Sequence, residues 1–240
     1  MEVSQKPLAI IQMGHPPEDI RHSQGEQPDW VKAALAGSAR PLSVVNPYRD
    51  EPLPDPSTIA GAVLTGSWSM VTDREDWSER TAEWLRAALQ AGLPLLGICY
   101  GHQLMAHAFG GVVDFHPKGR EIGQHNIELL PQAEHDGLLK ALPPRFHANL
   151  THEQSVLIPP KNAVVLARSE HDPHQILRYG PHALSVQFHP EFTVPLMAAC
   201  LARRTDVFSA EGFDVDGMLS ALAPTEHARQ LLRDFAGQLA

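Results

Sequence analysis

Short apolar runs alternate with segments of helical spacing through the first half of the chain. The runs are almost uniformly apolar, which is typical of strands buried on both faces of a parallel sheet. They lie at residues 8–13, 42–45, 59–65 and 93–98. Apolar positions near helical spacing predict helices at residues 30–35, 76–91 and 104–109. Residues 14–29 are polar and turn-rich and predict a long loop after the first strand.

The pattern changes after residue 112. Short strand-like runs punctuated by prolines lie at residues 127–130, 163–166 and 175–179, and the chain after residue 191 is mostly helical. Together the elements predict one α/β domain over residues 1–240. Its open, mostly parallel, doubly wound sheet is expected to be flavodoxin-like, with helices on both faces and additional antiparallel strands. The ligand site of such a sheet lies at the carboxyl ends of its strands.

Composition narrows the classes of function. The 240 residues carry a formal net charge of −9, which leaves no basic face for the phosphates of nucleic acid. No apolar run approaches the length of a membrane span, and the first residues lack the basic-then-apolar pattern of a signal peptide. Two cysteines make no disulfide framework. We therefore expect a cytoplasmic protein with no nucleic-acid or membrane partner.

Cys99 lies in the segment with the clearest chemical signature. Gly97 and Gly101 flank it at the end of an apolar run. This is the cysteine form of a nucleophile elbow, a tight turn that presents the nucleophile at the top of a sheet. The N-terminus of the following helix stabilises a thiolate, so Cys99 is a candidate nucleophile. The alternative is a buried thiol without chemistry, which is our expectation for Cys200 in its apolar helical run.

A second signature, His189-Pro190-Glu191, lies 90 residues beyond the cysteine and follows an apolar run. Residues i and i+2 of an extended strand project from the same face, so Glu191 is expected to reach the imidazole of His189. Cysteine, histidine and carboxylate supply the nucleophile, base and orienting group of covalent acyl transfer. The alternatives are a structural histidine at a strand end and a solvated loop carboxylate.

The segments Gly97–Gln103 and Gln187–Glu191, in this order, resemble the motifs of the class I glutamine amidotransferases. The resemblance covers residues 7–192 and leaves residues 193–240 as a helical C-terminal extension. It implies that Cys99 attacks the side-chain amide of glutamine to form a γ-glutamyl thioester, without a cofactor. Within the family, the chain resembles a free-standing glutaminase of the GMP-synthase type.

The tetrahedral intermediate of this reaction needs two hydrogen-bond donors for its oxyanion. The residue after an elbow nucleophile supplies one, so the backbone N–H of Tyr100 is the candidate. The resemblance places the second donor in the loop after the third strand, where Gly66 matches a family glycine. Ser67 stands where the family usually has a second glycine, and Trp68 where it has a proline. A backbone N–H from Ser67 still serves the same chemistry.

The resemblance also identifies pocket residues. Gln103 matches the glutamine that follows the family's nucleophile and helps to hold the substrate. Thr151, His152 and Glu153 begin a segment where the family often has Ser-His-Gly-Asp. His152 matches, whereas Glu153 replaces a glycine that usually lets the backbone approach the substrate. Glu153 either faces a substrate ammonium or points outward.

A metal site is the main competing use of the 14 histidines. His171 and His174 have plausible ligand spacing, but neither an HExxH nor a CxxC motif accompanies them. We therefore expect no metal.

Two enzymatic hypotheses remain, because the sequence contains no P-loop with which to use ammonia itself. The chain is either a glutaminase that passes ammonia to a separate synthase subunit or a free-standing hydrolase of γ-glutamyl amides or peptides. The same thioester chemistry serves both, since only the leaving group differs. A non-catalytic regulatory or binding module with this fold is a third hypothesis, which the complete set of Cys99, His189 and Glu191 disfavours.

Overall fold

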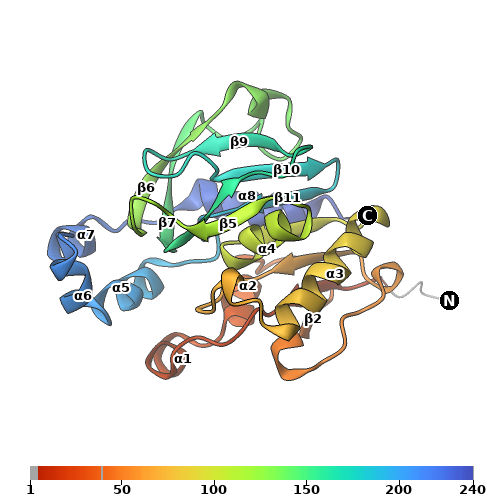
Figure 1. Cartoon of the computed structure of the whole chain (residues 1–240), viewed down its shortest axis with the longest axis horizontal. Helices are drawn as coiled ribbons and strands as arrows, with labels where there is room; N and C mark the ends of the chain where they lie inside the picture. Colours follow the sequence, from red (N-terminus) through yellow and green to blue (C-terminus); the bar gives the residue numbers. More distant parts are fainter. Residues whose placement is uncertain (1–4, 39, 240) are drawn as a thin grey trace.

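A parallel sheet lies at the centre of the molecule (Figure 1). The computed structural model describes residues 5–38 and 40–239. The parallel strands are β1 (Leu8–Ile11), β2 (Leu42–Val45), β3 (Gly61–Leu64), β4 (Leu95–Ile98) and β11 (Ala183–Val186). Their order in the sheet, β2-β1-β3-β4-β11, is that of flavodoxin-like folds. The predicted doubly wound architecture is therefore confirmed.

Antiparallel strands continue this sheet beyond β11. They are β10 (Ile176–Gly180), β9 (Val164–Arg168), β6 (Glu121–Leu129) and β7 (Arg145–His152), in that order. Separately, β5 (Val112–Phe115) pairs with β8 (Gln154–Ile158) in a two-stranded sheet. The predicted antiparallel addition is confirmed. The long β6–β7 hairpin also carries the end of β7 back to the parallel strands, where Asn149 bridges His189.

Helices cover both faces of the parallel sheet. Along β1, Leu8 and Ile10 belong to the apolar layer under α2 and α8, whereas Ala9 and Ile11 belong to the layer under α3 and α4. All four side chains are fully buried, which explains why the strand is apolar throughout. The helices are α2 (Gln27–Ala34), α3 (Asp76–Gln90), α4 (Tyr100–Ala108) and α8 (Glu226–Gly237). Short 3₁₀ turns lie in the connections at Pro47–Arg49, Pro56–Thr58, Val71–Asp73 and Pro131–His135.

The prediction of a long loop over residues 14–29 is wrong. This segment contains α1 (Glu18–Gln24) and the first turn of α2, separated by Gly25 at φ 81°. Only one residue of α1 is buried, so the helix shows no apolar periodicity. Glu26 and Asp29 form a capping box at the start of α2. Glycine and short polar residues are common both in turns and at the ends of helices. The polar pattern of residues 14–29 therefore predicted a loop where the structure has two helix ends.

The chain after residue 191 is helical, as predicted. Figure 1 shows α5 (Val194–Ala202), α6 (Thr205–Ala210) and α7 (Val215–Ala221) grouped at one end of the molecule. Their apolar residues, among them Phe208, form a cluster with the preceding Phe192, with Ile20 of α1 and with Trp30 of α2. This cluster fixes the C-terminal helices beside the segment that leaves β1. Within residues 5–38 and 40–239, no helix is both long and apolar enough to cross a membrane.

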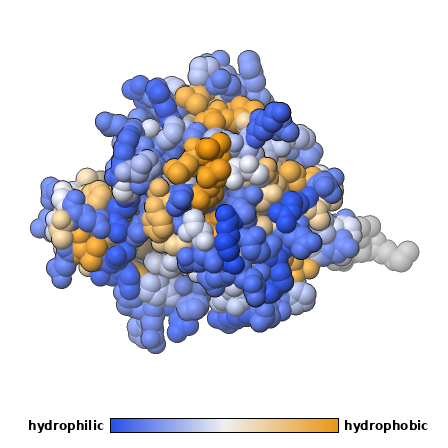
Figure 2. All heavy atoms as spheres, in the orientation of Figure 1, coloured by the Kyte–Doolittle hydropathy of each residue, from blue (hydrophilic) through white to orange (hydrophobic). Residues whose placement is uncertain are grey.

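Several large apolar side chains face solvent on the small sheet and its neighbour β9. They are Val112, Phe115, Leu157, Ile158 and Val164. Figure 2 shows apolar surface gathered over β5 and β9.

Candidate active site

Cys99 occupies a strained turn between β4 and α4. Its φ of 49° and ψ of −98° are rare for an L residue and are typical of strained functional positions. A Cβ atom at Gly97 would lie 2.6 Å from the carbonyl oxygen of Gly101, and one at Gly101 would lie 2.7 Å from that of Leu64. Both flanking glycines are therefore required by the close approach of the backbone. The turn has the form of a nucleophile elbow.

His189 and Glu191 lie beside this turn. Nδ1 of His189 is 2.7 Å from Oε1 of Glu191, and Nε2 has no hydrogen-bond partner within the described part of the chain. A Cβ atom on Gly66 would lie 2.8 Å from Cε1 of His189 and 3.6 Å from Cβ of Cys99. The ring and the thiol therefore meet over the same glycine. The structure brings together all three residues of the expected nucleophile, base and orienting group.

The path by which Glu191 reaches His189 differs from the expected one. β11 ends at Val186, and Pro190 and Glu191 lie in a turn instead of an extended strand. Pro190 has no N–H with which to continue a strand ladder. The backbone N–H of His189 donates to the carbonyl of Asn149 at 2.8 Å, which holds the histidine against β7. The contact between residues i and i+2 is thus made across a turn.

The environment of His189 favours its charged form. Burial alone lowers the pKa of His189, but the negative charges of Glu191 and Cys99 outweigh burial and raise this pKa to about 10. Phe192 stacks on the imidazole with ring centroids 4.0 Å apart and helps to exclude water. An imidazolium held between a carboxylate and a sulfur stabilises a thiolate, the nucleophilic form of cysteine.

The expected oxyanion donors flank Cys99. Tyr100 is the first residue of α4, so its N–H has no acceptor within the helix. Its phenol hydroxyl hydrogen-bonds Ser78 at 2.7 Å, so only the backbone of Tyr100 is available for the oxyanion. Gly66 and Ser67 follow β3 and line the same cavity as Cys99. Oγ of Ser67 accepts from the N–H of Ser69 at 3.0 Å, which shapes this loop from within.

A cavity of about 130 Å³ opens over Cys99 and is also lined by the expected pocket residues Gln103, Thr151, His152 and Glu153. The carbonyl oxygen of Thr151 lies 4.0 Å from Sγ of Cys99. Nε2 of Gln103 donates to the carbonyl of Gln154 at 2.6 Å. The turn between β7 and β8 therefore forms one wall of the cavity.

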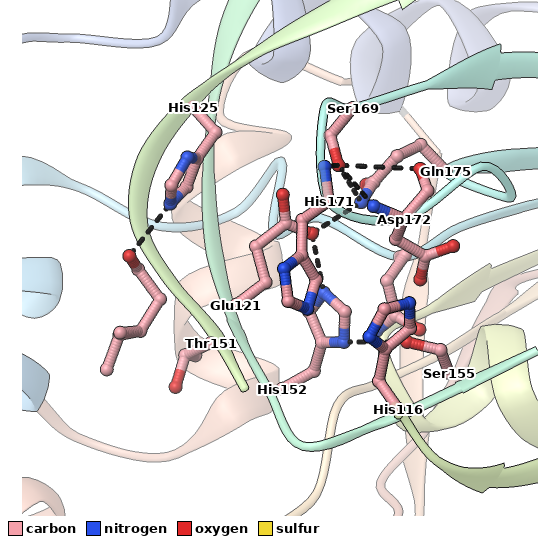
Figure 3. Close-up of polar contacts among 12 residues, drawn as sticks. His116, Glu121, His125, Thr151, His152, Ser155, Ser169, His171, Asp172 and Gln175 are labelled. Carbon is pink, nitrogen blue, oxygen red and sulfur yellow. Dashed lines mark hydrogen bonds and ion pairs between the residues drawn. The ribbon is translucent and has the colours of Figure 1, made fainter. Parts of the chain in front are cut away.

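The side chain of His152 points into a buried polar cluster behind this wall (Figure 3). Its Nδ1 lies 2.9 Å from the carbonyl oxygen of Gln154, and its Nε2 lies 3.0 Å from Oε2 of Glu121. Glu121 also accepts from Gln175 at 2.9 Å. Oγ of Ser155 also lies 3.3 Å from Nδ1, so both ring nitrogens of His152 have polar partners inside the protein. His152 thus braces the cavity wall through its side chain.

Glu121 is a member of this cluster that the sequence motifs do not identify. Burial raises the pKa of its carboxyl, but the hydrogen bond and charge of His152 outweigh burial and lower it. A charged residue at the first position of a strand is an ordinary pattern and carries no signal of its own. The stabilisation from ionised Glu121 is therefore present above the ordinary carboxyl pKa and is lost as the pH falls below it.

We expect Glu121→Gln to lower the free energy of unfolding by about 3–5 kcal/mol, because it breaks the buried pair of the Glu121 carboxylate with His152 and Gln175. Glu128→Gln, on the same strand, is the matched control. Glu128 pairs with Arg168 at 3.0 Å on the surface, where solvent screens the pair, so its loss is expected to change stability far less. Urea unfolding of the two variants measures the difference. Equal midpoints would contradict a stabilising role for the buried Glu121 carboxylate.

Glu153 lies at the mouth of the cavity and contacts two arginines. Nη1 of Arg120 and Nη1 of Arg204 both approach its Oε1, the latter at 3.4 Å. Glu153 is therefore already paired with cations, which disfavours the expectation that it awaits a substrate ammonium. Arg203 and Phe208 also line the cavity. The sequence motifs do not indicate these α5–α6 residues, because they lie in the C-terminal extension.

The remaining candidates have structural contacts. Burial raises the pKa of the Cys200 thiol to about 12, so this thiol stays protonated. Nε2 of His171 contacts the carbonyl of Gly119 at 3.0 Å, and Nδ1 of His174 contacts that of Val156 at 2.6 Å. In the portion of the chain that the structure describes, no group of three or more histidine, cysteine or acidic residues is arranged to hold a metal ion.

Known proteins resemble this chain in both sequence and fold. The model of the family "Glutamine amidotransferase class-I" matches residues 38–203, more than half of the chain. A subunit of the glutamine-hydrolyzing GMP synthase of Methanopyrus kandleri is 36% identical over 136 residues, which cover 55% of this chain and 66% of that protein. Gamma-glutamyl peptidase 5 of Arabidopsis thaliana is 27% identical over 145 residues, covering 60% and 58%. The chain thus spans less than two thirds of these relatives.

The fold comparison agrees with the family match. The crystal structure of a glutamine amido transferase from Methylobacillus flagellatus superimposes with a TM-score of 0.75 and 26% identity, covering 99% of this chain and 96% of that one. The superposition includes the C-terminal helices as well as the parallel sheet. The chain therefore belongs to the class I glutamine amidotransferase family.

Proposed function

We propose that this chain hydrolyses the side-chain amide of glutamine to glutamate and ammonia. The observation that carries the proposal is the meeting of Cys99, His189 and Glu191 at one cavity, on a strained elbow. The thiolate of Cys99 attacks the amide carbonyl, and the backbone N–H groups of Tyr100 and Ser67 stabilise the resulting oxyanion.

Proton transfer is assigned to His189. The imidazolium gives its proton to the departing ammonia as the carbon–nitrogen bond breaks and the γ-glutamyl thioester forms. The neutral ring then takes a proton from water, which attacks the thioester and releases glutamate. Cys99 leaves as a thiolate and His189 is again an imidazolium, so the site returns to its starting state. Glu191 keeps Nδ1 occupied and Nε2 directed toward the reaction.

The ammonia is proposed to pass to a synthase on another chain. The relative from Methanopyrus kandleri is named as one subunit of a GMP synthase, which supports a division of this kind.

A second candidate is the hydrolysis of γ-glutamyl amides or peptides. The charged and aromatic mouth of the cavity, formed by Glu153, Arg204 and Phe208, favours it, since ammonia needs no such surface. The relative from Arabidopsis thaliana is named a gamma-glutamyl peptidase. The acyl-enzyme chemistry is the same in both cases.

The proposed function is tested by measuring glutamate and ammonia released from glutamine, with asparagine as the matched substrate one methylene shorter. We expect equal amounts of the two products from glutamine and little from asparagine. If there is no turnover, labelling with iodoacetamide near neutral pH tests the site directly. Labelling of Cys99 no faster than that of Cys200 would contradict the proposal.

A further inference from the structure

The cavity over Cys99 continues beyond the reacting atoms to a mouth formed by four side chains. Glu153 comes from the turn between β7 and β8, and Arg204 and Phe208 come from the start of α6 and its interior. Trp68, from the loop after β3, also lines the cavity and is 38% exposed. Ammonia is small and uncharged, so its release uses neither a guanidinium nor an aromatic wall. This mouth therefore suits a larger leaving group.

The two arginines that contact Glu153 differ in how many hydrogen bonds they make to other protein groups and in how exposed they are. Arg120 donates to Glu211 from Nε at 2.5 Å and from Nη2 at 2.9 Å, in addition to its contact with Glu153. Its side chain is only 13% exposed. Arg204 makes one contact with Glu153, at 3.4 Å, and is 40% exposed. Arg204 is thus the arginine with donors available to a ligand.

Phe208 positions these guanidinium groups. The Cζ atoms of Arg120 and Arg204 lie 5.4 Å and 5.6 Å from the centroid of its ring, within the range of cation–π contact. A planar guanidinium held on an aromatic ring is pre-organised to bind a carboxylate through two parallel hydrogen bonds. The chemistry at the mouth is therefore that of carboxylate recognition.

The place of Arg204 and Phe208 in the chain indicates which part of a substrate they contact. The match to the family model ends at residue 203, so Arg204 and Phe208 lie just beyond the residues that this model matches. The γ-glutamyl half of the substrate is common to glutamine and to γ-glutamyl peptides. What differs between these substrates is the leaving group.

We propose that Arg204, supported by Phe208, binds a carboxylate on the leaving group when the substrate of this site is a γ-glutamyl amino acid or peptide. This inference rests on the cysteine mechanism proposed above. The carbon–nitrogen bond of the γ-amide breaks as the Cys99 thioester forms, and the departing amine takes its proton from His189. Water then hydrolyses the thioester. Glu153 keeps Arg120 as its partner when Arg204 turns to the ligand, so no carboxylate loses its cation.

The test compares γ-glutamyl-alanine with γ-glutamyl-alaninamide, which differ only in the terminal carboxylate. We expect the wild-type protein to have a kcat/KM about 10- to 100-fold higher for the acid, as a charge-assisted, two-point hydrogen bond implies. Arg204→Gln is expected to remove this preference, so that kcat/KM for the acid falls to about that for the amide. Arg168→Gln, at an exposed arginine of β9, is the control and is expected to keep the preference.

The outcomes separate this inference from the proposed function. Hydrolysis of glutamine by wild-type protein without any preference for the acid would overturn the role of Arg204 alone. A decrease of equal size for the acid and the amide in Arg204→Gln would do the same, since it would indicate a structural effect. Failure of the wild-type protein to hydrolyse any γ-glutamyl substrate would instead overturn the cysteine mechanism on which the inference rests.

Discussion

Replacing Cys99 with alanine is expected to lower the rate of glutamine hydrolysis by about four to six orders of magnitude, the loss typical for removal of a covalent nucleophile. The large effect follows from the arrangement around the sulfur. His189, Glu191 and the oxyanion donors act through the thioester, so none of them contributes fully once the nucleophile is absent. Alanine differs from cysteine only by the sulfur atom, so the fold is expected to persist.

Cys200→Ala is the matched control, because Cys200 is the other cysteine of the chain and lies in the apolar cluster of α5. Its activity per folded molecule is expected to equal that of the wild-type protein. Glutamate release measured for both variants, together with circular dichroism to verify folding, decides the result. Residual turnover of Cys99→Ala above about one hundredth of the wild-type rate would assign the chemistry to another group.

The chemical core of the site could be predicted from the sequence because its constraints are local. The elbow needs glycines at fixed offsets, since a Cβ atom at Gly97 or Gly101 would collide with backbone. The histidine and the glutamate are separated by one residue, so they remain neighbours whether the backbone is a strand or a turn. The expected contact between His189 and Glu191 is therefore present, although a turn and not an extended strand brings the two side chains together.

The surroundings of the site could not be predicted in the same way, because they depend on contacts between distant segments. Glu121 and His152 meet because β6 and β7 form a long hairpin. Arg204 reaches Glu153 only after α5 and α6 fold against α1 and α2. Neither pair has a characteristic spacing in the sequence. From the sequence alone, such charged residues cannot be distinguished from charged residues on the solvent-exposed surface.

Glu191→Gln is expected to reduce glutamine hydrolysis by about 10³- to 10⁴-fold, because the neutral amide does not stabilise the imidazolium of His189. The geometry at Nδ1, 2.7 Å from Oε1 in the wild-type protein, can be kept by the glutamine oxygen. The variant therefore separates the charge of Glu191 from its shape. The loss is expected mainly in kcat, since Glu191 contacts the base and not the substrate.

The same substitution changes how stability depends on pH. The pKa of His189 is raised to about 10 in the folded protein, above its ordinary value of 6.5. The stabilisation from its protonated form is fully present below pH 6.5 and is lost as the pH rises toward 10. We expect urea midpoints of the wild-type protein to fall across this window and those of Glu191→Gln to fall much less.

Glu79→Gln provides the control for this pH dependence, because Glu79 pairs with His107 at 3.0 Å in a partly exposed position. Solvent screens that pair, so its loss is expected to leave the decline between pH 6.5 and 10 intact. If Glu191→Gln retained the wild-type decline, His189 would not be the group that titrates. The pH dependence of stability would then come from another group, and the assignment of protonated His189 as the proton donor would be contradicted. A decline that disappears together with activity would instead tie both properties to the one buried ion pair.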